Sequence, residues 1–216
     1  MCCVRLRRKQ GIEEKFKDIS GFILDKPEAL KGKWKEYFGN DNSLYVEIGM
    51  GKGNFIKNMA NKEKNINFIG IDRVPEILYN ASKEGITELA NLRLLYIDVA
   101  YLESYFEAGD IDRIYLNFSD PWPKNRHAKR RLTSSDLLKK YKLLLKKDGE
   151  IHFKTDNLDF FKYSVTQFDI EGFSLRRMTY DLHNSGFEGN VMTEYEMKFA
   201  SMGCPICRCE AINPNS

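Results

Sequence analysis

Short apolar runs alternate with amphipathic stretches along most of this chain. Five runs rich in β-branched, leucine and aromatic residues predict strands over 44–48, 67–72, 92–98, 111–118 and 150–155. Apolar residues at helical spacing predict helices over 54–61, 75–84, 137–145 and 158–168. Strands that alternate with helices at this spacing form βαβ units. We therefore expect an α/β fold with a mostly parallel, doubly wound sheet that is covered on both faces.

The last quarter of the chain has a different pattern. An extended stretch over 173–181 is followed by a glycine-containing loop over 185–189 and a short helix near 193–202. Apolar and polar residues then alternate from Ile206 to Ile212, which is typical of a strand. These segments predict a C-terminal antiparallel pair added to the sheet. Upstream, Thr133-Ser-Ser-Asp136 is interpreted as a capping box that opens a helix, and Gly149 as the end of that helix.

The length of 216 residues fits one domain over 1–216, in which residues 1–40 form a basic arm and a helical segment packed on or near it. The net charge is only +3, but cations are concentrated in two places, Arg5–Lys9 and Lys124–Lys147. A local excess of positive charge indicates an anionic partner more strongly than the net charge does.

Targeting and metal signals are weak. No stretch reaches the roughly 18 apolar residues of a membrane span, and the basic N-terminus lacks the apolar core of a signal peptide. Five cysteines near the two ends make a poor disulfide framework and favour a reducing cytoplasm. The cluster Cys204-Pro-Ile-Cys207-Arg-Cys209 lacks the second ligand pair of a zinc site, so we expect no metal.

Acidic residues recur where the predicted strands end: Glu47, Asp72, Asp98, Asp120 and Asp156. The carboxyl ends of parallel strands share one edge of the sheet, which is where ligands of open α/β sheets bind. A carboxylate is costly to bury without a partner, so five at one edge point to a ligand site.

Gly49-Met-Gly51-Lys-Gly53 permits close backbone approach to a ligand, but nicotinamide, flavin and S-adenosylmethionine proteins all use such loops. Glu47 is more informative, because a carboxylate before the loop repels a pyrophosphate. It can instead accept hydrogen bonds from the amino end of an amino-acid-bearing cofactor. This favours S-adenosylmethionine over NAD, with Asp72 as an acceptor for ribose hydroxyls.

The segment Ser119–Arg131 joins an acid, an indole and a run of cations. Pro121 and Pro123 fix the backbone on both sides of Trp122, so Asp120 is presented by a stiff loop. A rigid carboxylate beside a phosphate-binding patch suggests chemistry on a nucleic acid base. Two readings of Trp122 stay open: it stacks on a base or cofactor, or it packs under the loop.

Four segments resemble the bacterial tRNA (guanine-N7-)-methyltransferase family: Glu47–Gly53, Asn117–Leu132, Phe153–Asp156 and Thr193–Phe199. Matching segments run in order from Leu6 to Arg208. The resemblance implies a Rossmann-like class I methyltransferase that uses S-adenosylmethionine to modify guanine 46 in the tRNA variable loop. Where the family usually has Glu, this chain has Asp72, which is shorter by one methylene and can still accept from a ribose hydroxyl.

The resemblance also implies residue roles. Cofactor contacts fall on Glu47, Gly49, Gly51, Asp72, Asp98 and Asp120, with Asp120 also catalytic; substrate contacts on Lys124, Asp156, Thr193, Glu194, Tyr195 and Glu196; and RNA contacts on Asn125, Arg126, His127, Ala128, Lys129, Arg130 and Arg131. Arg5, Arg7, Arg8 and Lys9 either extend the RNA surface or form a disordered terminus. We expect a cytoplasmic monomer or homodimer that binds tRNA, with no membrane and no obligate protein partner.

Guanine N7 carries an in-plane lone pair and no proton, so the reaction needs alignment and not a general base. Asp120 is expected to stabilise the positive charge that appears on the guanine ring. Asp156 is expected to read N1–H and the 2-amino group. The competing hypotheses are an exocyclic-amine methyltransferase, a non-catalytic RNA-binding module on a Rossmann fold, and a nicotinamide dehydrogenase.

Overall fold

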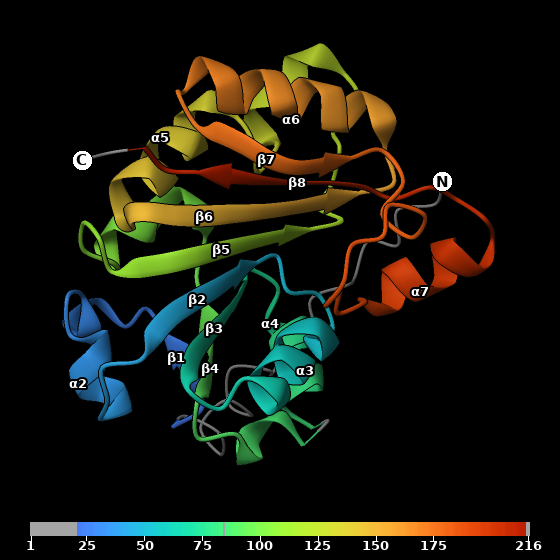
Figure 1. Ribbon diagram of the computed structural model, residues 1–216. Coiled ribbons are helices and arrows are strands. Elements are labelled where there is room, and N and C mark those ends of the chain that lie inside the picture. The colour runs from blue at the N-terminus through green and yellow to red at the C-terminus, as the bar shows by residue number, and fades with distance from the viewer. Residues whose placement is uncertain (1–20, 84, 215–216) are drawn as a thin grey trace.

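The structure of the protein is a computed structural model that describes residues 21–83 and 85–214 (Figure 1). Its core is one eight-stranded sheet with the strand order β1-β4-β3-β2-β5-β6-β8-β7. The strands are β1 (Ile23–Asp25), β2 (Ser43–Ile48), β3 (Ile66–Asp72), β4 (Leu92–Tyr96), β5 (Ile111–Asn117), β6 (Leu145–Thr155), β7 (Ser174–Thr179) and β8 (Cys207–Ile212). The helices are α2 (Trp34–Phe38), α3 (Asn54–Lys62), α4 (Pro75–Ser82), α5 (Ser135–Leu144), α6 (Leu158–Ile170) and α7 (Glu194–Ser201), joined by the short 3₁₀ turns η2 (Glu28–Leu30), η3 (Ile86–Glu88), η4 (Val99–Ser104) and η5 (Asn125–Arg130).

The direction of the strands confirms the predicted fold class. The six strands from β1 to β6 run parallel, while β8 lies antiparallel between β6 and β7. From β2 the chain winds one way through β3 and β4, and from β5 it winds the other way. The switch point therefore lies between β2 and β5. In open α/β sheets, ligands bind in a crevice outside the carboxyl ends of the strands at this point.

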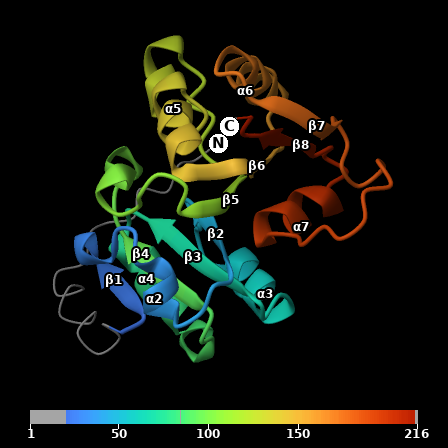
Figure 2. The ribbon, with the colours of Figure 1, turned by 60° about the vertical axis from the view of Figure 1, so that its left-hand side comes forward.

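Each face of the sheet has its own apolar layer, because alternate residues of a strand point to opposite faces. On β3, Phe68 packs in a cluster with Ile56 of α3 and Leu78 of α4. The neighbouring Ile69 belongs to the other cluster, which includes Tyr141 of α5 and further residues of α6 and α2. Figures 1 and 2 show α5 and α6 beside the β5–β7 half of the sheet and α3 and α4 beside the β2–β4 half. Helix α7 lies apart from both layers, close to the carboxyl ends of the strands.

Some local predictions were wrong. Thr133 and Asp136 do not form a capping box: Ser134 occupies the N-cap of α5 without a side-chain cap, and the Thr133 hydroxyl bonds to Ser164 instead. Gly149 does not end that helix, because the chain turns directly into β6 at Leu145. The edge strand β1 was not predicted, since three residues are too short to show a period. Among the described residues, no helix is long and apolar enough to cross a membrane.

Candidate active site

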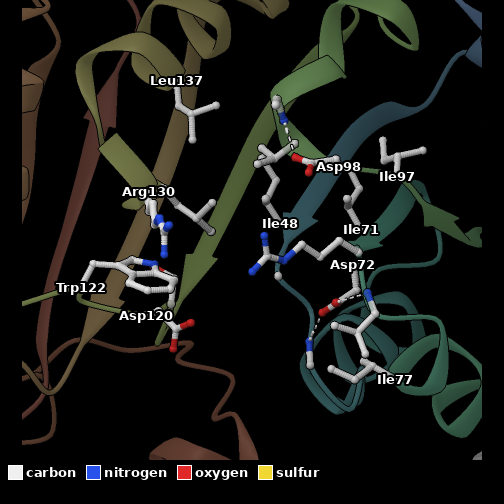
Figure 3. A pocket seen from close by; sticks show the side chains of 18 of the residues that line it. Ile48, Ile71, Asp72, Ile77, Ile97, Asp98, Asp120, Trp122, Arg130 and Leu137 are labelled. Carbon is white, nitrogen blue, oxygen red and sulfur yellow. Dashed lines mark hydrogen bonds between the residues drawn. The ribbon is translucent and has the colours of Figure 1, made fainter. Parts of the chain in front are cut away.

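A cavity of about 850 Å³ opens at the carboxyl edge of the sheet, next to the switch point. Asp72 and Asp98 lie on one side of it and Asp120 on the other, with Trp122 and Arg130 beside Asp120 (Figure 3). Apolar side chains form its floor: Ile48, Ile71 and Ile97, with Ile77 and Leu137 at the sides. The cavity thus combines an apolar surface for a flat ring with carboxylates at its rim, a typical composition for a small-molecule site.

Backbone amides fix two of these carboxylates. Asp72 accepts hydrogen bonds from the amides of Gly51 (3.3 Å) and Val74 (3.0 Å), and burial raises its pKa. Asp98 is exposed and caps the turn η4 by accepting from the amide of Ala100 (2.9 Å). The bond from Gly51 to Asp72 ties the glycine loop to the end of β3. The loop therefore has a defined position before any ligand binds.

Asp120 is exposed at the tip of a constrained loop. Phe118 and Trp122, two residues away on either side, have positive φ values of 51° and 41°, which bulky side chains rarely adopt. Arg131 holds this backbone: its guanidinium donates to the carbonyls of Pro121 (2.9 Å) and Trp122 (3.0 Å) and stacks over Tyr163 at 4.1 Å.

Arg131 differs in placement from the other cations of the basic run. Its residue exposure is only 7%, and its guanidinium donates to the loop carbonyls, so in the free protein it supports the loop. The other cations of the patch face solvent. Arg126, Lys129 and Arg130 are exposed on the turn η5, and Arg130 lies over the Trp122 ring at 4.9 Å. Arg5, Arg7, Arg8 and Lys9 lie outside the described residues.

Glu47 does not line the large cavity. It lies on a second cavity of about 390 Å³, and Gly49, Gly51 and Phe118 separate the two by lining both. Glu47 is 2% exposed as a residue, and its carboxyl accepts from Asn117 Nδ2 (2.9 Å) across the β2–β5 switch point. Its second oxygen, Oε2, and the Asn117 carbonyl Oδ1 make no hydrogen bond of normal geometry among the described residues.

When Glu47 is ionised, its Oε2 and the Asn117 Oδ1 are two buried acceptors without a hydrogen bond of normal geometry, and each unsatisfied polar atom costs free energy. A ligand that brings several N–H groups, such as an ammonium group, would satisfy both. Burial also raises the pKa of Glu47 to about 8, opposed by the Asn117 amide and the Lys154 cation. Burial of Glu47 therefore lowers the stability of the free protein. A bound cation would favour the ionised form of its carboxyl and compensate for this cost.

The predicted substrate segment 193–196 closes the second cavity from the other side. Tyr195 lies with its ring 5.1 Å from that of Phe118, and its hydroxyl donates to Asp156 (3.4 Å). Glu194 pairs with Lys52 of the glycine loop (2.7 Å) and accepts from Asn54.

Thr193 lines the second cavity, whereas Glu196 is buried inside the protein. The Thr193 hydroxyl oxygen accepts from the Glu196 amide (2.9 Å) and caps α7. Glu196 is fully buried and pairs with Lys154 of β6 at 2.6 Å. Lys124 is exposed and lines neither cavity.

Sequence reasoning missed two residues, Asn117 and Lys154. Both lie at buried strand positions on the same sheet face as Glu47, and their Cα atoms are direct partners in the β5–β6 register. The available signal is a polar residue inside a run that is otherwise apolar. Asn117 comes three residues before Asp120, and Lys154 comes two before Asp156.

A second charged cluster occupies the same sheet face, farther from the edge. Glu150, His152 and Glu210 approach one another closely enough to suggest a metal site. Arginines already bind the two carboxylates: Arg113 and Arg176 at Glu150, and Arg176, Arg177 and Arg208 at Glu210. The cluster is thus an ion-pair network that joins β5, β6, β7 and β8. Cys207 and Cys209 are buried on the opposite face of β8, in the apolar layer.

Comparison with known proteins identifies a family and relatives with similar sequences. A family model described as "Putative methyltransferase" matches residues 41–209. A tRNA (guanine-N(7)-)-methyltransferase of Geobacillus sp. (strain WCH70) is 51% identical over 98% of this chain and 96% of the relative. A tRNA (guanine-N(7)-)-methyltransferase of Streptococcus thermophilus (strain CNRZ 1066) is 49% identical over 96% of this chain and 98% of the relative.

Solved structures give the same fold at low sequence identity. The 16S rRNA methyltransferase KamB has a TM-score of 0.64 at 10% identity, covering 84% of this chain and 92% of that one. The aminoglycoside resistance methyltransferase NpmB1 has a TM-score of 0.61 at 18% identity, with the same coverage. These likenesses identify the fold as that of class I methyltransferases.

The buried Glu47 predicts an unusual dependence of stability on pH. Because its pKa is raised in the folded state from 4.5 to about 8, the folded state binds the proton more tightly than the unfolded state. This contribution to stability is complete below pH 4.5 and is lost as the pH rises to 8. We expect Glu47→Gln, which keeps the acceptor for Asn117, to raise the free energy of unfolding at pH 8 by on the order of 3 kcal/mol.

Urea denaturation of both proteins at pH 5 and pH 8 measures this difference. The gain should be small at pH 5 and large at pH 8. The exposed Glu36→Gln serves as the control and should change neither value. A loss of stability at pH 8 in Glu47→Gln would mean that the carboxylate is charged and satisfied in the free protein.

Proposed function

The chain belongs to the tRNA (guanine-N7-)-methyltransferase family, and on this basis we propose that it transfers a methyl group from S-adenosylmethionine to N7 of guanine 46 in the tRNA variable loop. The observation that carries the cofactor assignment is the pair of buried acceptors on Glu47 and Asn117 beside the glycine loop. The α-ammonium group of this cofactor provides the donors that both atoms lack. A pyrophosphate is an anion without N–H donors, so it would be repelled by the Glu47 carboxylate and could not satisfy either acceptor.

The remaining acids fit the rest of the cofactor. Asp72 at the end of β3 is placed to accept from ribose hydroxyls, and Asp98 rims the part of the cavity where Ile71, Ile77 and Ile97 offer an apolar surface to the adenine ring. When bound, the cofactor supplies an electrophilic methyl group on a sulfonium. The protein residues have only to bind it, exclude water and align the base.

Asp120 is proposed to act on charge and geometry. Its loop is held by Arg131 and by two positive-φ residues, so the carboxylate does not have to be ordered during the reaction. As the methyl group moves, positive charge develops on the imidazole ring of guanine, and a preorganised carboxylate stabilises that charge. No proton leaves N7, so Asp120 is not required as a base.

The second cavity is proposed to serve both molecules: its buried end at Glu47 and Asn117 takes the ammonium group of the cofactor, and its exposed end near Tyr195 takes the guanine. It adjoins the cofactor cavity through Phe118, and Tyr195 provides a second ring on which an unstacked base can lie. Asp156 lines neither cavity, but it accepts from the hydroxyl of Tyr195, which does, and we propose that it accepts from guanine N1–H and the 2-amino group when the base is bound. Recognition of this edge would distinguish guanine from adenine, which presents an acceptor there.

The turn η5 is proposed to hold the RNA backbone. Lys124, Arg126, Lys129 and Arg130 project from it or from the residue before it, next to the cavity that contains Asp120. Such cations neutralise phosphates and set the register of the RNA without reading its sequence. We further propose that the protein acts in the cytoplasm, where tRNA is modified, as a monomer or homodimer without an obligate protein partner.

Incubation with unmodified tRNA and labelled S-adenosylmethionine tests this function. We expect one labelled product, 7-methylguanine, and chain cleavage at position 46 after borohydride and aniline treatment. A transcript with adenine at position 46 is the matched control and should remain unlabelled. Label in N2-methylguanine or N6-methyladenine would contradict the proposal in favour of exocyclic-amine chemistry.

Substitution of the loop carboxylate should separate turnover from binding. Asp120→Ala is expected to lower kcat by about 10²- to 10³-fold, the usual effect of removing one preorganised electrostatic group. Filter binding should give a Kd for tRNA within about threefold of the original, since Asp120 makes no phosphate contact. The exposed Asp169→Ala on α6 is the control for carboxylate loss. Equal losses in kcat and tRNA affinity would contradict the assigned role.

The two kinds of arginine should respond differently to salt. Arg126→Ala with Arg130→Ala removes two exposed cations and should lower the slope of log Kd against log salt by about 1.5 to 2. Arg131→Ala should leave that slope unchanged, because its guanidinium is buried against loop carbonyls. It should instead reduce kcat and melting temperature by releasing the loop. A reduced salt slope in Arg131→Ala would restore it to the RNA-binding set.

A further inference from the structure

Lys154 is a buried cation at the carboxyl edge of the sheet, next to Asn117, which lines the second cavity. It lies on β6 beside Asn117 of β5, which in turn bonds to Glu47 of β2. Its side chain is 6% exposed, and burial lowers its pKa against the opposing effect of Glu196. A lysine is rarely buried so completely unless its charge is balanced and its donors are used.

All three ammonium donors of Lys154 go to one stretch of chain. Nζ donates to Glu196 Oε2 (2.6 Å), to the carbonyl of Val191 (3.0 Å) and to Asn190 Oδ1 (3.2 Å). The Asn190 amide returns a bond to Glu196 Oε1 (2.6 Å), which closes a small network. This single side chain therefore connects the sheet to residues 190–196, which carry the second wall of the guanine site.

Both oxygens of Glu196 are used inside the protein. It is 0% exposed, and its two oxygens accept from Lys154 and Asn190, while His183 lies 3.5 Å from Oε1. It is absent from the lining of both cavities. Tyr195, the residue before it, faces the second cavity and Asp156. Because the Glu196 side chain is anchored inside the protein, the Tyr195 ring is held at the cavity wall.

The charged surroundings of Lys154 come from three elements. Glu196 on α7 pairs with it, Glu47 on β2 attracts it, and Arg208 on β8 repels it. The rings of Phe55 and Phe118 lie 5.3 Å and 6.0 Å from Nζ, so the rest of its environment is aromatic. An unpaired Glu196 in this environment would be strongly unfavourable, which makes the ion pair a firm tether.

We propose that Lys154 is a positioning residue for substrate binding, and that Glu196 anchors residues 190–196 to it and does not touch the guanine. This inference rests on the proposed function, because the wall that the pair holds is the proposed guanine site. It reassigns Glu196 from the substrate contacts that the family resemblance implies. It also gives a role to Lys154, which no sequence argument had singled out.

Three variants test the pair: Lys154→Met, Glu196→Gln and the double variant, which keeps the volume and leaves no unpaired buried charge. We expect each to raise the KM for tRNA at least tenfold and to change the Kd for S-adenosylhomocysteine, measured by calorimetry, several-fold less. Hydrogen exchange of residues 190–201, measured without tRNA, should be faster in all three. The double variant should raise the KM for tRNA no more than the single variants do, since the two side chains act as one unit.

Lys35→Met is the matched control, because it makes the same substitution in an exposed ion pair. Lys35 lies on α2 and pairs with Asp41, which follows that helix. This variant should alter neither the KM for tRNA nor the exchange of residues 190–201. Two results would overturn the inference. One is a Glu196→Gln variant with reduced kcat and unchanged exchange, which indicates direct contact with the base. The other is a double variant with the original KM and exchange. Exchange and cofactor binding need no turnover, so they still test Lys154 if the wild-type protein forms no 7-methylguanine.

Discussion

The arrangement of this protein depends on one unfavourable interaction, the burial of the Glu47 carboxyl at the switch point of the sheet. Desolvation raises its pKa to about 8, and among the described residues only one of its two oxygens has a hydrogen bond of normal geometry, from Asn117. A side chain chosen for stability would be neutral at this position. Keeping a carboxyl there lowers stability at neutral pH and provides a receptor for a cationic group, a common exchange between stability and function. The glycine loop, Asn117 and Lys154 are all arranged around this group.

Two different solutions keep the carboxylates of the site in place. Glu47 and Asp72 are buried and fixed by hydrogen bonds. Asp120 is exposed and fixed only through its backbone, by strained residues on both sides and by the guanidinium of Arg131 beneath them. The first solution suits groups that bind parts of a ligand whose charge does not change during the reaction. The second suits a group that must stay charged while facing a charge that develops during the reaction.

Sequence patterns predicted the parallel sheet, the acidic edge and the family, because these depend on local period and on spacing along the chain. They did not predict which polar residues point inward. Arg131 and Arg130 are neighbours in one basic run, yet one braces a loop and the other is exposed. Glu196 and Glu194 lie in the same motif, yet only Glu194 reaches a cavity. These differences arise from contacts between segments far apart in sequence, such as Lys154 with Glu196, which a single sequence does not reveal. The capping box failed for a related reason, since the Thr133 hydroxyl finds Ser164 of another helix.

The position of β8 has a consequence for how the protein is made. This strand is the last one along the described residues and lies between β6 and β7. Neither of those strands can therefore complete its pairing before β8 has formed. During synthesis the edge of β6 stays unpaired and β7 has no neighbour, a state in which exposed strand edges favour aggregation. A product that stops before residue 207 could not join β7 to the sheet or complete the arginine–glutamate network. Residues 207–212 are therefore required to join β7 to the sheet and to pair the free edge of β6.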